Sequence, residues 1–174
     1  MTSRPNVLIS QKAIQDRVAE LGRIISEAYP PTCPLILIGV LRGALYFISD
    51  LSRTISQPAI IDLISVSSYA GSNSTGKVTF HQKTHTNITG KDVLLIEDIV
   101  DTGRTIHALL QHFQKQNPRS IKICTLLNKP SRREVSVPIH YCGFRIPDHF
   151  VVGYGLDYEQ SYRNLPYIGL LNLP

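Results

Sequence analysis

Residues 93–105 read Val-Leu-Leu-Ile-Glu-Asp-Ile-Val-Asp-Thr-Gly-Arg-Thr, and this stretch decides the fold. Its apolar beginning, Val93–Ile96, is typical of a short strand that is buried on both faces. A turn with carboxylates, a glycine and hydroxyl groups follows, and apolar residues then recur with helical spacing over Thr105–Gln116. In open α/β sheets, ligands bind beyond the carboxyl ends of the strands. The stretch therefore predicts a strand, a turn and a helix with a binding site between them.

The same turn offers receptors for a phosphate and for a sugar. The beginning of a helix presents free N–H groups and the positive end of the helix dipole, which suit a phosphate monoester. Gly103 would let the backbone approach that phosphate, and Thr102 and Thr105 can add hydroxyl donors. Glu97 and Asp98 can accept hydrogen bonds from ribose hydroxyls. The stretch therefore indicates a site for a phosphorylated sugar.

Three other interpretations of this turn are weaker. A surface turn without function would bring several carboxylates together beside a phosphate-binding turn without a ligand or metal ion, which is energetically costly. The Asp-Thr-Gly at 101–103 also occurs in aspartic proteases, but those enzymes need an all-β setting and a second carboxylate site. A dinucleotide-binding fold needs Gly-x-Gly-x-x-Gly after a strand, and the sequence has none.

Short apolar runs and amphipathic segments alternate along the rest of the chain. The expected helices are Gln11–Ala28, which Ser10 can cap, and Ala44–Ile55; the expected strands are Leu35–Val40, Ala59–Val66, Val78–His81 and Ile121–Leu127. The residues expected to face inward in the two helices are Ile14, Val18, Leu21, Ile25, Leu45, Ile48, Leu51 and Ile55. This alternation predicts an α/β fold with a parallel sheet, right-handed crossovers and helices on both faces.

After about Val135 the pattern changes to short β segments interrupted by Pro138, Pro147 and Pro166. We expect this tail, about 136–174, to form most of a small hood beside the main sheet. No linker, repeat or low-complexity tract divides the chain, so residues 1–174 are expected to form a single domain.

Composition narrows the class of protein and of partner. Hydrophobic residues make up 43% of the 174 residues and charged residues 18%, which is typical of a globular domain. The N-terminus lacks the apolar run of a signal peptide, and no later stretch approaches the roughly 20 apolar residues that span a bilayer. We therefore expect a cytoplasmic protein without a membrane partner. The net charge of +5 suggests an anionic partner, and because the basic residues are dispersed, we expect small phosphates rather than nucleic acid.

The segment Ser67–Lys77, Ser-Ser-Tyr-Ala-Gly-Ser-Asn-Ser-Thr-Gly-Lys, has one aromatic residue and almost no apolar anchors. Such a segment buries too little surface to hold itself against the protein. A plain linker would fit this composition, but an aromatic residue within a Ser/Gly loop between two strands fits an active-site lid better.

Five separate motifs, in the same order, resemble those of type I phosphoribosyltransferases, in particular the bacterial members of their hypoxanthine-guanine branch. The motifs are Val40–Gly43, Ser68-Tyr69, the acidic signature Glu97–Thr105, Leu127–Pro130, and Phe150–Tyr158 followed by Arg163. The similarity extends from Leu35 to Leu170. It implies a parallel-sheet core with a small hood. It also implies transfer of the 5-phosphoribosyl group from 5-phosphoribosyl-1-diphosphate to hypoxanthine or guanine, giving IMP or GMP and pyrophosphate.

The resemblance assigns a set of residues to phosphoribosyl diphosphate, namely Leu41, Arg42, Gly43, Glu97, Asp98, Asp101, Thr102, Gly103, Arg104, Thr105 and Arg163. Residues 97 and 98 would hold the ribose hydroxyls, and residues 101–105 would surround the 5-phosphate. Residues 41–43 would receive the pyrophosphate, through a loop with an unusual cis peptide between Leu41 and Arg42. Arg163 would clamp the diphosphate with its planar guanidinium.

The resemblance also assigns residues to the purine, namely Lys129, Phe150, Val151 and Asp157. Phe150 would stack on the base, the backbone of Val151 would read its edge, and Lys129 would donate to the 6-oxygen. Outside this motif, such a phenylalanine is more often a core residue and such a lysine a solvated surface charge. Because a lysine ammonium has three donors and no acceptor, Lys129 would favour a 6-oxopurine over adenine.

Further roles are implied for the proton, the metal ion and the lid. Asp101 is placed to accept the proton that the base loses, although a plain Asx-turn onto Gly103 also explains an aspartate there. The implied cofactor is Mg²⁺, and its candidate ligands are Glu97, Asp98 and Asp157. Ser68 and Tyr69 would belong to the lid.

The sequence departs from the family pattern in places, and other functions stay open. Arg42 stands where many members carry lysine, and Ala70 replaces a glycine after the lid tyrosine. One alternative is a phosphoribosyltransferase for xanthine or a pyrimidine. Another is a nucleic-acid-binding regulator that senses phosphoribosyl diphosphate, although such regulators tend to carry a winged-helix domain or a concentrated basic face. The resemblance also suggests a homodimer or homotetramer.

Overall fold

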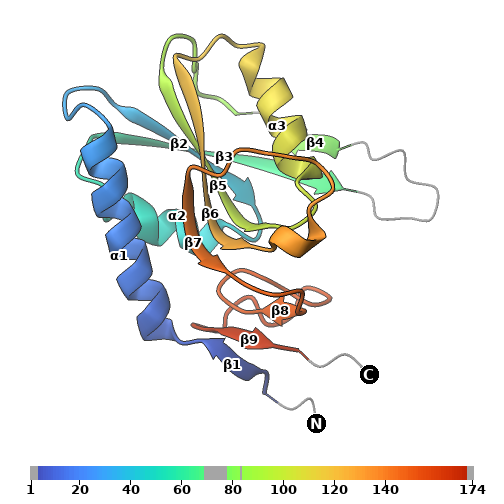
Figure 1. Cartoon of the computed structure of the whole chain (residues 1–174). Helices are drawn as coiled ribbons and strands as arrows, with labels where there is room; N and C mark the ends of the chain where they lie inside the picture. Colours follow the sequence, from blue (N-terminus) through green and yellow to red (C-terminus); the bar gives the residue numbers. More distant parts are fainter. Residues whose placement is uncertain (1–3, 69–77, 83, 172–174) are drawn as a thin grey trace.

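The computed structural model describes residues 4–68, 78–82 and 84–171, and at its centre lies a six-stranded sheet (Figure 1). In spatial order the strands are β4 (Val78–Gln82), β3 (Ala59–Ser68), β2 (Leu35–Leu41), β5 (Asp92–Val100), β6 (Ser120–Asn128) and β7 (Tyr141–Arg145). Neighbouring strands are parallel except β3 and β4, which are antiparallel. The predicted α/β class with a parallel sheet is confirmed.

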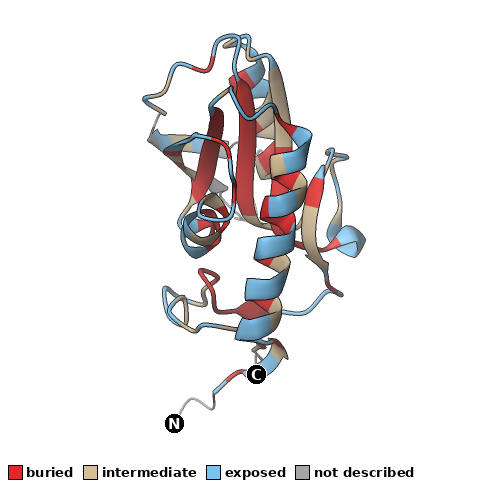
Figure 2. Ribbon diagram, turned by 90° about the vertical axis from the view of Figure 1, so that its left-hand side faces the viewer, coloured by how far each residue is buried: buried red, intermediate tan, exposed pale blue. Residues whose placement is uncertain are grey.

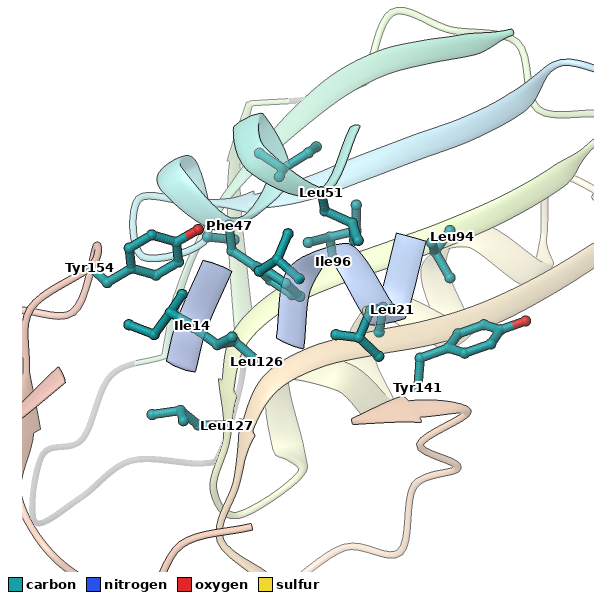
Figure 3. Close-up of a cluster of buried hydrophobic side chains, with 14 of the residues drawn as sticks. Ile14, Leu21, Phe47, Leu51, Leu94, Ile96, Leu126, Leu127, Tyr141 and Tyr154 are labelled. Carbon is teal, nitrogen blue, oxygen red and sulfur yellow. The ribbon is translucent and has the colours of Figure 1, made fainter. Parts of the chain in front are cut away.

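Helices cover both faces of this sheet, as expected. Side chains of α1 (Gln11–Ala28) and α2 (Leu45–Ser52) belong to one buried cluster, and those of α3 (Arg104–Gln114) belong to the other. The alternation of side chains along β2 supplies both clusters, because Leu35 and Leu37 point to the first and Ile36 and Ile38 to the second. Figure 3 shows the first cluster, where side chains of α1, α2 and β5 gather.

The first helix follows the prediction from sequence closely. The hydroxyl of Ser10 accepts a hydrogen bond from the backbone N–H of Ala13 at 3.2 Å and so caps the helix. The four apolar residues expected to face inward are buried, and the opposite face of the helix is exposed (Figure 2). Within the described part of the chain, no helix is both long and apolar enough to cross a membrane.

The burial of two segments differs from what their apolar residues indicate. Leu45 is 46% exposed, and Phe47 is buried in its place. The reason is that the helix begins only at Leu45, and the face formed by Phe47, Ile48 and Leu51 packs on the sheet. The first residues of β3 are exposed as well, because β4 pairs only with the last residues of β3 and leaves its beginning at the sheet edge.

The hood is a second sheet that lies beyond the carboxyl end of β7 (Figure 1). Its strands are β1 (Asn6–Ile9), β9 (Ile168–Leu170) and β8 (Val151–Val152), in that spatial order and antiparallel. The hood was expected to consist mainly of about 136–174. Its sheet also contains the N-terminal strand β1, and β7 belongs to the main sheet instead. β7 belongs there because it continues the parallel ladder on β6. Tyr154, just after β8, packs against α1 and α2 (Figure 3).

Candidate functional site

The acidic stretch is part of β5 itself. The strand continues to Val100, so Glu97 and Asp98 lie within it and not in a turn, which corrects the expectation that the strand ends at Ile96. Its parallel pairing with β6 runs as far as Val100 opposite Asn128. The sheet ladder therefore fixes the backbone that carries both carboxylates.

These two carboxylates are held in an unfavourable electrostatic state. Glu97 is 7% exposed, and its Oε2 has no hydrogen-bond partner among the residues that the structure describes. Burial, and then the neighbouring Asp98, raise the pKa of Glu97 well above its usual range. Asp98 is half-buried and accepts a hydrogen bond from the N–H of Ile99 at 2.8 Å, and burial raises its pKa too. Hydroxyl donors or a positive charge from a ligand would relieve both groups.

The turn after β5 leads directly into α3. Gly103 is the N-cap of this helix with φ of 86°, and a Cβ there would collide with the carbonyl oxygen of Val135. The carbonyl of Thr102 accepts hydrogen bonds from the N–H groups of Glu134 and Val135, each at 3.0 Å. A cavity of about 390 Å³ opens beside this turn. The predicted residues that line it are Glu97, Asp98, Asp101, Thr102, Gly103 and Thr105.

The side chain of Arg104 is not brought into this cavity. Its Nε donates to Oε2 of Glu134 at 2.7 Å, so the guanidinium points to the segment that follows the 3₁₀ helix η1 (Pro130–Arg132). Only the backbone of Arg104, as the first residue of α3, is part of the helix terminus that faces the cavity.

A second cavity, of about 410 Å³, contains all the residues predicted to bind a purine, namely Lys129, Phe150, Val151 and Asp157. Lys129 is 7% exposed, and its Nζ lies 3.7 Å from Oδ1 of Asp148. The ring of Phe150 is 42% exposed and stands edge-to-face against Tyr158, with centroids 5.6 Å apart. Asp101 lines this cavity as well as the first one, so the two cavities adjoin at that side chain.

The residues predicted to receive pyrophosphate also lie together. The peptide bond between Leu41 and Arg42 is cis, as expected. Gly43 approaches Asp98 so closely that a Cβ at position 43 would collide with its carboxylate. Arg163 donates to the carbonyl of Gly155 at 2.7 Å and pairs with Oδ1 of Asp157 at 2.7 Å.

Two charged residues of the site were missed by the sequence reasoning. Arg132 lines both cavities, with its Nε 3.4 Å from Oδ1 of Asp101 and its Nη1 3.7 Å from Oδ2 of Asp148. Asp148 thus lies between two cations, Arg132 and Lys129. Arg132 and Asp148 are close in sequence to the motifs at Lys129 and Phe150, and this was the one sign that they belong to the site. Charge alone does not distinguish them from ordinary surface residues.

The expected lid and the expected metal ligands have different outcomes. Ser68 is the last residue of β3, and Tyr69 lies outside the described residues, so the lid stays a prediction. In the described ranges, no group of three or more His, Cys, Asp or Glu side chains is arranged to hold a metal ion. Glu97, Asp98 and Asp157 therefore do not form a site made by the protein alone.

Comparisons with known proteins agree with this arrangement. The family model described as the phosphoribosyl transferase domain matches residues 8–159. A hypoxanthine phosphoribosyltransferase of Salmonella typhimurium is 47% identical over 165 residues, which cover 94% of this chain and 93% of the relative. A hypoxanthine-guanine phosphoribosyltransferase of Bacillus subtilis is 48% identical over 166 residues, with 95% and 92% covered. The crystal structure of a Bacillus anthracis hypoxanthine-guanine phosphoribosyltransferase, with HEPES in its active site, superposes with a TM-score of 0.93 at 43% identity, covering 98% of this chain and 100% of that one.

Proposed function

The chain belongs to the phosphoribosyl transferase family, and from that premise we propose that it transfers the 5-phosphoribosyl group of 5-phosphoribosyl-1-diphosphate to hypoxanthine or guanine. The products are IMP or GMP and pyrophosphate. The observation that carries the proposal is that Asp101 lines both the cavity beside the helix terminus and the cavity with Lys129 and Phe150. A sugar phosphate in the first cavity and a base in the second would meet at this residue.

The first cavity suits the sugar phosphate. A 5-phosphate at the beginning of α3 would accept hydrogen bonds from the free backbone N–H groups and interact with the positive end of the helix dipole. Gly103 supports this role because its missing side chain and left-handed conformation keep the turn against Val135. The ribose hydroxyls would donate to Glu97 and Asp98, and this would satisfy the buried Oε2 of Glu97.

The same carboxylates fit a magnesium ion that arrives with the diphosphate. Mg²⁺ is typically held by one or two carboxylates together with substrate phosphates and water, so a three-carboxylate cage is not needed. The buried Oε2 of Glu97 supports a cation nearby. When bound, Mg²⁺ would neutralise charge on the departing pyrophosphate. Asp157 is already paired with Arg163, and we propose that it takes part on this side together with that arginine.

The second cavity suits a 6-oxopurine. Phe150 presents an exposed ring on which a base can stack, and Val151 follows it with backbone groups that can read the edge of the base. Lys129 is almost completely buried, so its ammonium favours a ligand that offers an acceptor. The 6-oxygen of hypoxanthine or guanine provides one, and the 6-amino group of adenine does not.

In the reaction, the bond between ribose C1 and the pyrophosphate oxygen breaks and a ring nitrogen of the base forms the new bond to C1. We assign Asp101 as the group that accepts the proton released by that nitrogen. Arg42 and Arg163 stabilise the negative charge of the leaving pyrophosphate. The site holds base and sugar in adjoining cavities, and this orientation supplies a further part of the rate enhancement.

A product assay tests the proposal. We expect nucleotide formation with hypoxanthine and guanine, dependence on magnesium, and almost none with adenine. Efficient use of xanthine or of uracil instead would support the alternative substrates. Salt-resistant filter binding of RNA, without transfer to any base, would support a regulator and contradict the enzyme. We further propose that the protein acts in the cytoplasm as a homodimer or homotetramer, which sedimentation of the purified chain would test.

A further inference from the structure

A tight turn at Glu159 and Gln160 stands beside the pyrophosphate side of the site. Tyr158 and Ser161 flank it and exchange two backbone hydrogen bonds, with N···O distances of 3.2 and 2.9 Å. Glu159 has φ of 49° and Gln160 has φ of 65°, so both lie in the left-handed region that a type I′ turn requires. Glycine and asparagine adopt this conformation at low cost, whereas a long side chain does so less readily. The choice of glutamine is therefore not explained by the turn itself.

The side chain of Gln160 accepts hydrogen bonds from two arginines. Its Oε1 lies 3.0 Å from Nη1 of Arg42 and 3.1 Å from Nη2 of Arg163. Its backbone N–H donates to Oδ2 of Asp157 at 2.9 Å, and Oδ1 of the same carboxylate pairs with Arg163 at 2.7 Å. Arg42 and Arg163, which are distant in sequence, are thereby joined at the amide oxygen of Gln160, and the backbone N–H of the same residue holds Asp157.

The charge of the acceptor matters. Two guanidinium groups that approach each other repel, and both belong to long side chains that lose rotational freedom when they are ordered. A neutral amide oxygen accepts from both without cancelling their charge, whereas a carboxylate at the same place would compete with an incoming anion. Gln160 therefore orders both arginines before the ligand binds, without adding a second negative charge to the one that Asp157 already brings to Arg163.

We infer that Gln160 is a positioning residue that assembles Arg42 and Arg163 into a preformed receptor for the diphosphate group. Gln160 contacts the arginines and not the reacting atoms, so it acts on the affinity for diphosphate and not on the base. The inference rests on the proposed function, because it takes the pyrophosphate moiety as the anion that the two arginines receive.

The variant Gln160→Asn tests this directly, because it separates the turn from the side-chain contacts. Asparagine suits the left-handed backbone better than glutamine, but its side chain is one methylene shorter and does not reach both arginines. We expect a thermal midpoint equal to or above that of the wild type. We also expect calorimetric affinity for magnesium pyrophosphate to fall about 5- to 20-fold, as for the loss of hydrogen bonds to charged groups. Affinity for IMP, which carries no diphosphate, should not change.

Kinetics provide a second measurement. The KM for phosphoribosyl diphosphate should rise by a factor similar to the loss of pyrophosphate affinity, while the KM for hypoxanthine stays the same. Gln160→Met, which keeps the side-chain length but lacks the amide, should behave like the asparagine variant. A purely structural residue would instead lower the thermal midpoint and weaken both ligands together.

The matched control is Glu159→Asn, which changes the other left-handed residue of the same turn. In the described structure the side chain of Glu159 forms no hydrogen bond or ion pair with either arginine, so pyrophosphate affinity should not be weakened. Wild-type pyrophosphate affinity in both Gln160 variants would overturn the inference, and so would an equal loss in Glu159→Asn. If the wild-type protein itself bound no pyrophosphate and formed no nucleotide, the proposed function would fail first and the inference with it.

Discussion

The two ends of β5 carry buried carboxylates in opposite electrostatic states. At the amino end, Asp92 is 8% exposed and accepts hydrogen bonds from Nε of Arg119 at 2.9 Å and from Oγ of Ser120 at 2.7 Å. Arg119 above all holds the pKa of Asp92 below its usual range. At the other end, Glu97 is equally buried, but within the described chain its Oε2 lacks a partner, and burial raises its pKa.

This difference shows how a structural carboxylate is distinguished from one that awaits a ligand. Both residues are almost fully hidden from solvent, so exposure alone does not separate the two roles. The hydrogen-bond donors around each carboxylate do, because a buried polar atom without a partner costs free energy that a ligand able to donate would recover. Asp92 has its donors in the fold as it stands, whereas we propose that Glu97 receives a donor from a bound ligand.

The largest effect is expected for base choice, at Lys129 beside the carboxyl end of β5. In the wild type, kcat/KM for adenine should be about 10⁴-fold below that for hypoxanthine, since a site built to bond the 6-oxygen rejects an analogue lacking it. Lys129→Gln, whose amide can donate or accept, should lose most of this preference while affinity for phosphoribosyl diphosphate stays nearly unchanged. Comparable turnover of adenine and guanine by the wild type would refute the 6-oxopurine assignment.

The next effect is expected at Asp101, which adjoins both cavities. Asp101→Asn should lower kcat by about 10²–10⁴-fold while leaving the binding of phosphoribosyl diphosphate intact, because the amide keeps the shape of the side chain and cannot accept the proton. Single-turnover rates across pH, together with calorimetric binding, measure the two quantities separately. Wild-type turnover in this variant would contradict the assignment of Asp101 as the base and leave its ion pair with Arg132 as the role of the aspartate.

Glu97→Gln should have opposite effects on stability and on ligand binding, as we expect of a buried carboxylate that waits for a ligand. Burial and Asp98 disfavour the ionised form of Glu97, so a neutral amide in its place should raise the free energy of unfolding at pH 7 by about 1 kcal/mol. The same change should weaken phosphoribosyl diphosphate binding by about 10-fold, because a hydrogen bond to a charged acceptor is lost. Chemical denaturation and calorimetry on the same preparation test both. A less stable variant would mean that Glu97 is a structural residue like Asp92.

The smallest effect is expected at the amino end. Asp92→Asn should lower the free energy of unfolding at neutral pH by only about 1 kcal/mol, because Arg119 is half-exposed and solvent screens the pair. The pKa of Asp92 is lowered in the folded state, so its contribution is present above the ordinary aspartate pKa of about 4 and is lost as the pH falls through the lowered value. The gap between wild type and variant in urea denaturation should therefore narrow as the pH falls below about 4.

Steady-state rates of Asp92→Asn provide the matching control. Asp92 is at the end of β5 opposite to the cavities, and rates at neutral pH should equal those of the wild type. A change in KM for either substrate would break the distinction between the two ends of the strand.

Much of the fold follows from periodicity. The helix Gln11–Ala28 has the predicted bounds, because its cap and its apolar face are local signals. The four residues 97, 98, 101 and 103 could be singled out because they lie in one short stretch. Leu45 was expected to face inward and does not, and the burial of Phe47 and the place of β7 in the main sheet were not predicted. Helix rotation and sheet membership depend on neighbours that are distant in sequence.

By itself, the sequence determined the alternating α/β plan and the glycine turn before α3 that we propose binds the phosphate, because hydrophobic periodicity, helix capping and the glycine at 103 act within a few residues. Only the tertiary structure decided that Asp101 adjoins both cavities, that Arg132 and Asp148 lie among the residues predicted to bind the base, and that Gln160 joins Arg42 to Arg163. These contacts bring together segments separated by as many as 118 positions. Local propensities cannot predict contacts between residues so far apart in the sequence. The pairing of β5 with β6 and the packing of the hood bring these residues together.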